Sequence, residues 1–141
     1  IVVPKDQSQL FIIAGVGACQ TVEFINSLCA SAPGIQFDLL ICSVHGNYMV
    51  RQSLITHGYK LRDERIIFEN NRFYEAIYVS HRGHEKIATT GSRMWDWSNP
   101  YHQDYWQRIV GHYRQKAKSE PLKFQSIVED YERLFVTISN I

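Results

Sequence analysis

Residues 10–17 read Leu-Phe-Ile-Ile-Ala-Gly-Val-Gly, and this stretch decides the fold. Five apolar residues in succession are typical of a strand that is buried on both faces, as in a parallel sheet. The glycines that follow predict a tight turn into a helix. Residues 21–32 carry apolar side chains at helical spacing, and Pro33-Gly34 ends that pattern. The stretch therefore predicts a strand-loop-helix unit.

The same plan recurs further along the chain. Residues 37–44 predict a second buried strand, and residues 48–57 predict a second helix. Two such units in succession favour a parallel sheet with right-handed crossovers. Residues 59–69 and 72–80 are rich in β-forming residues and are separated by two asparagines, which suit a two-residue turn. The expected fold class is α/β, with two parallel βα units followed by an antiparallel β-hairpin.

The remainder of the chain predicts a helical appendage. Residues 81–100 are polar and aperiodic, which indicates a connector, although Trp95 and Trp97 suggest that it docks on a folded body. Beyond it, apolar residues recur every three or four positions in two runs separated by a proline, which predicts an antiparallel helical hairpin. The periodic residues are Trp106, Ile109, Tyr113, Ala117, Phe124, Ile127, Tyr131, Leu134 and Ile138. The expected domains are 1–80, the connector 81–100 and the hairpin 101–141.

Composition narrows the class of protein only modestly. The chain has 141 residues with 15 basic and 14 acidic side chains, a balance that excludes neither nucleic-acid nor small-molecule partners. Three cysteines without metal-ligand spacing fit thiols in a reducing cytoplasm, so a cytoplasmic location is expected. His81 and His84 have no third ligand beside them, so no metal site is expected. No apolar stretch approaches the roughly 18 residues of a membrane helix.

Four segments resemble one enzyme family. Residues 12–17 are similar to the Ile-Ala-Gly-Met-Gly-Gly signature of the bacterial tRNA (adenine-N1)-methyltransferases that modify adenine 22, which are class I, S-adenosylmethionine-dependent enzymes. Residues 37–45 resemble the family's second strand, 50–54 its following helix, and 73–76 its Tyr-Glu-Val hairpin element. The resemblance covers residues 9–80. It implies the second half of a Rossmann-like methyltransferase sheet followed by a C-terminal α-helical hairpin.

The resemblance also implies that this chain is a C-terminal fragment. The family's cofactor-binding half, with its acidic Gly-rich loop and ribose-binding carboxylate, is absent, and Ile1 is not an initiator methionine. The missing N-terminal half of the same protein is therefore an expected partner, and the fragment alone is expected to be inactive. A small complete domain with a processed N-terminus is the alternative. Two departures stand out: Ala18 replaces a glycine of the signature, and residues 43–45 replace a Gln-Pro-Asn-like stretch.

A Gly-x-Gly turn at the carboxyl end of a parallel strand is where ligands bind in open α/β sheets. The resemblance implies that Gly15, Val16 and Gly17 line the floor between S-adenosylmethionine and a target base, with Ala14 and Gly15 on the cofactor. His45 ends the next strand and is a further candidate for the catalytic site. Methyl transfer to adenine N1 needs positioning more than acid-base help. A packing turn and a helix-capping or solvent-facing histidine are the open alternatives.

The first predicted helix of the appendage carries a basic run that resembles an RNA-backbone footprint. Arg108, Arg114, Lys116 and Lys118 are the candidate tRNA contacts, and a solvated helix face explains them equally well. The second hypothesis is accordingly a non-catalytic RNA-binding or oligomerisation module, with homo-oligomers formed through the hairpin. A methyltransferase with another RNA position or a small molecule as substrate is a third, because the fold alone does not select a substrate.

Overall fold

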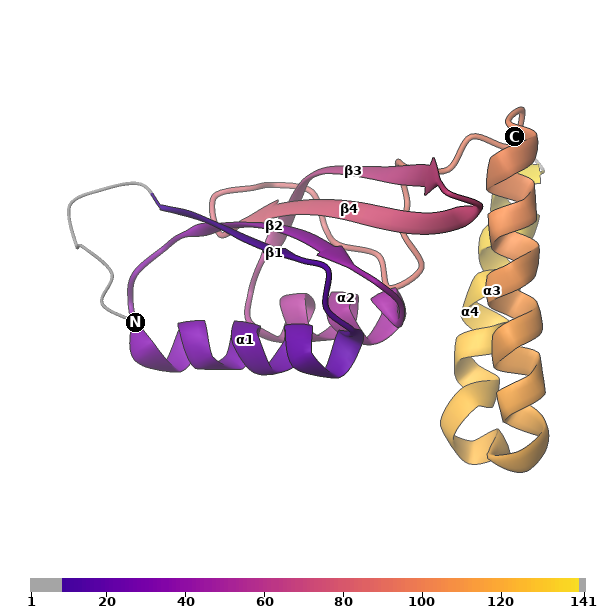
Figure 1. Cartoon of the computed structure of the whole chain (residues 1–141), viewed down its shortest axis with the longest axis horizontal. Coiled ribbons are helices and arrows are strands. Elements are labelled where there is room, and N and C mark those ends of the chain that lie inside the picture. Colours follow the sequence, from indigo (N-terminus) through magenta and orange to yellow (C-terminus); the bar gives the residue numbers. More distant parts are fainter. Residues whose placement is uncertain (1–8, 140–141) are drawn as a thin grey trace. The chain divides into compact units, whose positions relative to one another are not determined.

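The structure is a computed structural model that describes the backbone of residues 9–139 and the side chains of residues 9–136. Its elements, in chain order, are β1 (Leu10–Ala14), α1 (Ala18–Ser31), β2 (Asp38–Ser43), α2 (Asn47–Thr56), β3 (Lys60–Glu69), β4 (Arg72–Ser80), α3 (Pro100–Ser119) and α4 (Pro121–Ser139). Two compact units follow one another along the chain, Ile1–Met94 and Trp95–Ile141. The predicted α/β class, followed by C-terminal helices, is confirmed (Figure 1).

The first unit contains one four-stranded sheet in the order β1-β2-β4-β3. Strands β1 and β2 are parallel, whereas β4 runs antiparallel to both of its neighbours. The β3-β4 turn places Asn70 and Asn71 at φ 51° and 60°, the left-handed values that a two-residue primed turn requires. Glu69 lies opposite Arg72 in the register. The predicted hairpin is therefore confirmed down to its turn.

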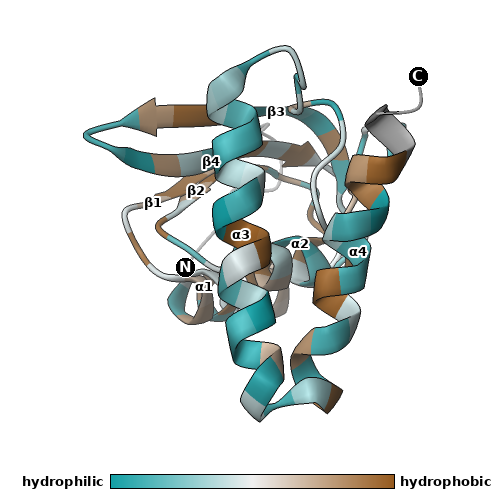
Figure 2. Cartoon of the chain, turned by 90° about the vertical axis from the view of Figure 1, so that its right-hand side faces the viewer, coloured by the Kyte–Doolittle hydropathy of each residue, from teal (hydrophilic) through white to brown (hydrophobic). Residues whose placement is uncertain are grey.

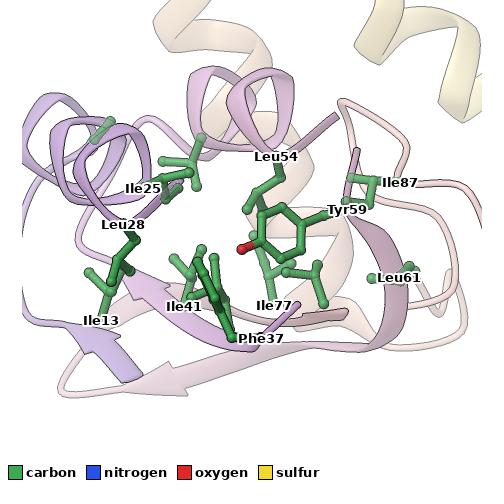
Figure 3. Close-up of a cluster of buried hydrophobic side chains, with 14 of the residues drawn as sticks. Ile13, Ile25, Leu28, Phe37, Ile41, Leu54, Tyr59, Leu61, Ile77 and Ile87 are labelled. Carbon is green, nitrogen blue, oxygen red and sulfur yellow. The ribbon is translucent and has the colours of Figure 1, made fainter. Parts of the chain in front are cut away.

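Helices α1 and α2 lie on the same face of the sheet (Figure 1). Ile25 of α1 and Leu54 of α2 point into a cluster that also contains Ile41 of β2 and Ile77 of β4 (Figure 3). All four side chains are fully buried. Burying a side chain of this size contributes about 1.5–3 kcal/mol, so the two helices hold the sheet mainly through this cluster.

The prediction that β1 is buried on both faces is wrong for the structure of this chain. The side chains of Leu10 and Ile12 are 52% and 66% exposed, whereas Ile13, on the helix side, is buried. Within residues 9–139, β1 is an edge strand, and α1 and α2 cover only one face of the sheet. An apolar run shows that a strand can be buried on both faces, but burial of the second face also requires other elements that pack against it.

The predicted connector is divided between the two units. Its first part stays with the sheet, where the Leu61 N–H donates to the Glu85 carbonyl at 2.8 Å. Its last part belongs with the helices, and the rings of Trp95 and Trp97 stack there with centroids 5.4 Å apart. Asn99 then caps α3 by accepting a hydrogen bond from the Tyr101 N–H at 2.9 Å. The predicted domain limits at 80 and 100 stay a prediction.

Helices α3 and α4 pair as a hairpin in the second unit, and hydrophilic residues predominate along α3 (Figure 2). Six of their described side chains are almost fully buried: Tyr105, Val110, Ala117, Phe124, Val128 and Tyr131. Val110 and Val128 lie outside the predicted periodic series, so the buried surface is wider than a narrow heptad seam. Ile138 lies outside the described side chains. No helix among the described residues is long and apolar enough to cross a membrane.

Candidate functional site at the carboxyl edge of the sheet

The turns that follow β1 and β2 lie side by side. The two strands are parallel, and Ala14 stands opposite Cys42 at their carboxyl ends. The Gly15 N–H donates to the Cys42 carbonyl at 3.3 Å, and the Val44 N–H donates to the Val16 carbonyl at 3.0 Å. Residues 14–17 and 43–46 therefore form one hydrogen-bonded edge, which we call the rim.

The first half of the rim needs glycine for its backbone. Gly15 has a φ of 76°, in the left-handed region that favours glycine, and a Cβ placed there would meet no atom within 4 Å. Gly17 caps α1 with extended backbone and no side-chain hydrogen bond. The first N–H groups of α1 have no partner within the helix, so this turn presents donors beside an open backbone.

His45 lies against the first half of the rim. Its side chain is exposed, and a Cβ placed on Gly17 would approach the imidazole Cε1 and Nε2 atoms to 3.3 Å. The residue that caps α2 is Gly46, with no side-chain hydrogen bond, so His45 does not cap that helix. The structure thus brings His45 together with the predicted Gly15–Gly17 turn. Their catalytic and cofactor-binding roles stay predictions.

Two buried polar residues support the rim, and sequence reasoning assigned neither of them a role there. Ser43 is fully buried, and its hydroxyl donates to the His45 carbonyl at 2.9 Å, with the Val16 carbonyl at 3.3 Å as a second acceptor for the same proton. It therefore ties both turns together. Asn47, the first residue of α2, is 7% exposed, and its Oδ1 has no hydrogen-bond partner among the described residues. The only feature of the sequence that could have indicated these two residues is their position as polar residues at or after the end of a predicted buried strand.

Ala18 and Gly46 form a matched pair between the two turns. A Cβ placed on Gly46, whose φ is 71°, would lie 2.5 Å from the Cβ of Ala18. Ala18 is 2% exposed. The methyl group that departs from the glycine of the family signature is therefore accommodated because residue 46 has no side chain.

Neither the cysteines nor the histidines suggest a second reactive centre. Burial raises the pKa of the Cys29 and Cys42 thiols, which favours their protonated, less nucleophilic forms. Cys19 is exposed at the start of α1. In the part of the chain that the structure describes, no group of three or more His, Cys, Asp or Glu side chains is placed to hold a metal ion.

Two of the four predicted RNA contacts have acidic neighbours. The Arg108 guanidinium lies 2.9 Å from an Asp104 carboxylate oxygen, and that of Arg114 lies 2.8 Å from Glu132 on the other helix. Both ion pairs are solvent-exposed, where such pairs contribute about 0–1 kcal/mol. Their carboxylates nevertheless offset the positive charge that a phosphate would meet at these positions.

The other two predicted RNA contacts lie near the end of α3. Lys116 and Lys118 are both exposed. The ammonium groups of Lys116 and Lys123 lie 5.1 and 5.2 Å from the centre of the Phe124 ring, so α4 contributes a third lysine to the same end. Three lysines therefore gather at this end of the hairpin, although the Glu120 carboxylate lies 3.9 Å from the Lys123 ammonium group and offsets its charge.

A parallel strand pair extended by an antiparallel hairpin, with a glycine turn at its carboxyl edge, is the arrangement expected for the second half of a class I methyltransferase sheet. A family model for the methyltransferase domain matches residues 1–77, more than half of the chain. The chain therefore belongs to the methyltransferase domain family. No curated protein sequence gives a significant match.

Solved structures of similar fold agree with this assignment. The m1A22 tRNA methyltransferase TrmK of B. subtilis has a TM-score of 0.71 and 17% identity, over 94% of this chain and 65% of its own. TrmK of M. capricolum, in complex with S-adenosyl-homocysteine, has a TM-score of 0.68 and 16% identity, over 92% of this chain and 62% of its own. A Streptococcus agalactiae protein of the NADB-Rossmann superfamily has a TM-score of 0.65 and 15% identity, over 89% and 59%.

The predicted resemblance to the tRNA (adenine-N1)-methyltransferases is confirmed at the level of fold. This chain spans less than two thirds of the length of each of these three proteins.

Proposed function

We propose that this chain is the C-terminal part of an S-adenosylmethionine-dependent methyltransferase that modifies N1 of an adenine in tRNA. The observation that carries the proposal is the rim, where the open Gly15–Gly17 turn is hydrogen-bonded to the Ser43–His45 turn. Membership of the methyltransferase domain family supports methyl transfer. The likeness to TrmK supports tRNA as the substrate.

The residues present fit one side of the proposed cofactor site. The open space at Gly15 lets a ligand approach the backbone of Ala14 and Gly15 closely. A related fold that holds S-adenosyl-homocysteine supports the choice of cofactor. In this proposal, the acidic loop and the ribose-binding carboxylate belong to a preceding N-terminal half, so this chain supplies only a minor part of the cofactor contacts.

S-adenosylmethionine, when bound, supplies an electrophilic methyl group on a sulfonium sulfur. The adenine N1 lone pair forms the new N–C bond as the S–C bond breaks, and the product base becomes a cation. Neutral N1 is already nucleophilic, so the work of this chain is to orient the base. The rim glycines let the base approach the backbone, and the exposed imidazole of His45 contacts the base or an adjacent phosphate.

The uncovered face of the sheet supports the proposed N-terminal partner. Side chains alternate across a strand, so Leu40 and Tyr78 point away from the face that α1 and α2 cover. Together with Leu10 and Ala76, and with Asp63, Glu64 and Arg65 of β3, they line a hollow of about 330 Å³. Exposed apolar surface of this kind marks an interaction site. The missing half of the same protein is the occupant proposed here.

Cofactor binding and methyl transfer test this proposal. Calorimetry with this 141-residue chain should detect no tight binding of S-adenosylmethionine. The full-length protein should bind the cofactor and convert adenine to N1-methyladenosine in tRNA, measured by mass spectrometry of digested RNA. Micromolar binding by the chain alone would contradict the proposed division of the site. Methylation of a different nucleoside by the full-length protein would contradict the proposed target.

A second candidate function is non-catalytic RNA binding through the hairpin, and the lysines at the end of α3 favour it. Changing Lys116 and Lys118 together to Glu should lower tRNA retention in a filter assay by at least about tenfold, because phosphate contacts dominate such affinity. Changing Arg108, Arg114 and Lys116 together to Glu tests the basic run that the sequence predicts as an RNA contact, and it should abolish tRNA retention. Arg108→Glu alone is the control, since Asp104 already offsets that charge. Unchanged retention in all variants would remove this candidate.

A cytoplasmic location and homo-oligomers formed through the hairpin are further proposals. The location rests on the absence of disulfides among three cysteines. The oligomer rests on the amphipathic character of α3 and α4.

A further inference from the structure

One arginine of α2, Arg51, lies fully buried between a glutamate of β3 and a glutamate of β4. The Arg51 Nε and Nη2 atoms donate to Oε1 of Glu75 at 3.0 and 2.9 Å, and Nη2 also donates to Oε2 of Glu64 at 2.9 Å. The side-chain exposures of all three residues are 0–1%. Charged groups are almost never buried this completely unless they are paired. We call these three residues the buried triad.

The triad reaches the rim through two elements. Glu75 of β4 stands directly opposite Ser43 in the register, on the same face of the sheet. Ser43 is the residue whose hydroxyl ties together the carbonyls of Val16 and His45. Arg51 lies one helical turn after Asn47, the first residue of α2, so both point from the same side of that helix. The Arg51–Glu75 bond thus joins α2, one turn after its first residue, to the position of β4 that lies opposite Ser43.

The other side of the triad holds a different segment. Nη1 of Arg51 donates to the Ala88 carbonyl at 3.2 Å. Oε1 of Glu64 accepts hydrogen bonds from the Ser92 N–H at 3.3 Å and hydroxyl at 3.2 Å. Glu64 therefore fastens Ser92 to β3, whereas Glu75 stands opposite Ser43 of the rim. The two carboxylates are alike in burial and in charge but serve different parts of the unit.

The charges in the triad fix its geometry. Burial by itself disfavours the charged guanidinium, but the nearby Glu75 and Glu64 carboxylates outweigh this effect and raise the pKa of Arg51 above its ordinary value. Arg51 therefore stays charged at any physiological pH. A planar guanidinium that donates to two carboxylates has few alternative arrangements, because moving it would leave a buried carboxylate without its hydrogen bonds.

We propose that Arg51 and Glu75 are positioning residues for the rim: they hold α2 against β4 at the position opposite Ser43, and so set where His45 and the Gly15–Gly17 turn meet the target base. This inference rests on the proposed function for its chemical consequence. It does not rest on that function for its structural consequence, which is the rigidity of the 43–47 turn.

Matched Asp substitutions separate positioning from simple stabilisation. Glu75→Asp and Glu64→Asp each keep the buried charge and withdraw the carboxylate by one methylene, about 1.5 Å. In the full-length protein, Glu75→Asp should lower the single-turnover rate of methyl transfer to tRNA by about tenfold or more, because a shift of about 1 Å can cause a hundredfold loss. The dissociation constants for cofactor and tRNA should stay within about twofold.

Glu64→Asp is the control, and its rate should stay within about threefold of wild type. Hydrogen exchange supplies a second readout that needs no activity. Glu75→Asp should speed exchange of the Val44 amide, which donates to Val16, whereas Glu64→Asp should speed exchange in residues 88–94. If either Asp variant fails to fold, the same rates are measured and compared for Glu75→Gln and Glu64→Gln, which keep the side-chain length.

Equal rate losses in the two variants, or a wild-type rate with Glu75→Asp, would overturn the proposal. If the wild-type full-length protein transfers no methyl group to tRNA, the proposed function fails instead. In that case amide hydrogen exchange alone tests the positioning role. Identical exchange rates of the Val44 amide in both variants would contradict it.

Discussion

Replacement of Arg51 by Met is expected to lower the free energy of unfolding of this chain by about 3–5 kcal/mol, the usual loss when one member of a buried ion pair is removed. The substitution keeps much of the side-chain volume but leaves Glu64 and Glu75 as two buried carboxylates without their cation. Urea unfolding followed by circular dichroism measures the change.

Neutralising the two carboxylates provides the matched control. Adding Glu64→Gln and Glu75→Gln to Arg51→Met removes every charge of the triad, and should restore a large part of the lost stability, because no buried charge is then left uncompensated. A loss below about 1 kcal/mol in the single variant would show that the carboxylates escape to solvent. No recovery in the triple variant would show that packing around Arg51 matters more than its charge.

Replacement of Gly46 by Ala is expected to lower the free energy of unfolding by about 2–5 kcal/mol, the second large effect. A φ of 71° at a residue with a side chain costs about 1–2 kcal/mol. The new methyl would also lie 2.5 Å from the Cβ of Ala18, and overpacking of this kind costs about 1–3 kcal/mol. Thermal unfolding of the purified variant gives the loss, and exchange at the Val44 amide reports whether the rim separates.

The double variant Ala18→Gly with Gly46→Ala divides these two causes. It should recover the steric part, because the methyl at position 18 is gone, and retain the part caused by the left-handed backbone. Ala18→Gly alone should cost about 1 kcal/mol, from the lost burial and the glycine in a helix. Additive losses in the double variant would mean that residues 18 and 46 do not touch, which contradicts the close approach of the two turns.

Local sequence signals predicted the β-hairpin and the existence of each helix, but α1 begins at Ala18, before residue 21, where the predicted helix begins. The two asparagines tolerate the positive φ of a primed turn, whereas Pro100 and Pro121, which were predicted to lie in the connector and between the two helices, are the first residues of α3 and α4. These features act over a few neighbouring residues. A turn of this kind can therefore be recognised from the sequence without the structure.

The residues that support the candidate site were harder to predict. The sequence indicated the Gly15–Gly17 turn and His45, because each follows an apolar run that predicts a strand. Nothing local linked Arg51 to Glu64 and Glu75, which lie 13 and 24 residues away in the chain. Charged residues on a helix or strand are most often solvent-exposed, so their burial is visible only once the elements pack.

By itself, the amino-acid sequence determined the order of the elements, the turn of the hairpin, the glycine turn at the end of β1 and the family resemblance, because hydrophobic periodicity and turn chemistry act over short distances along the chain. The packing of the strands and helices was needed to show that Leu10 and Ile12 are exposed, that Ala18 fits against Gly46, and that Arg51 is buried between Glu64 and Glu75. Each of these facts depends on which surfaces meet, and side chains remote in sequence meet only when the strands and helices have packed.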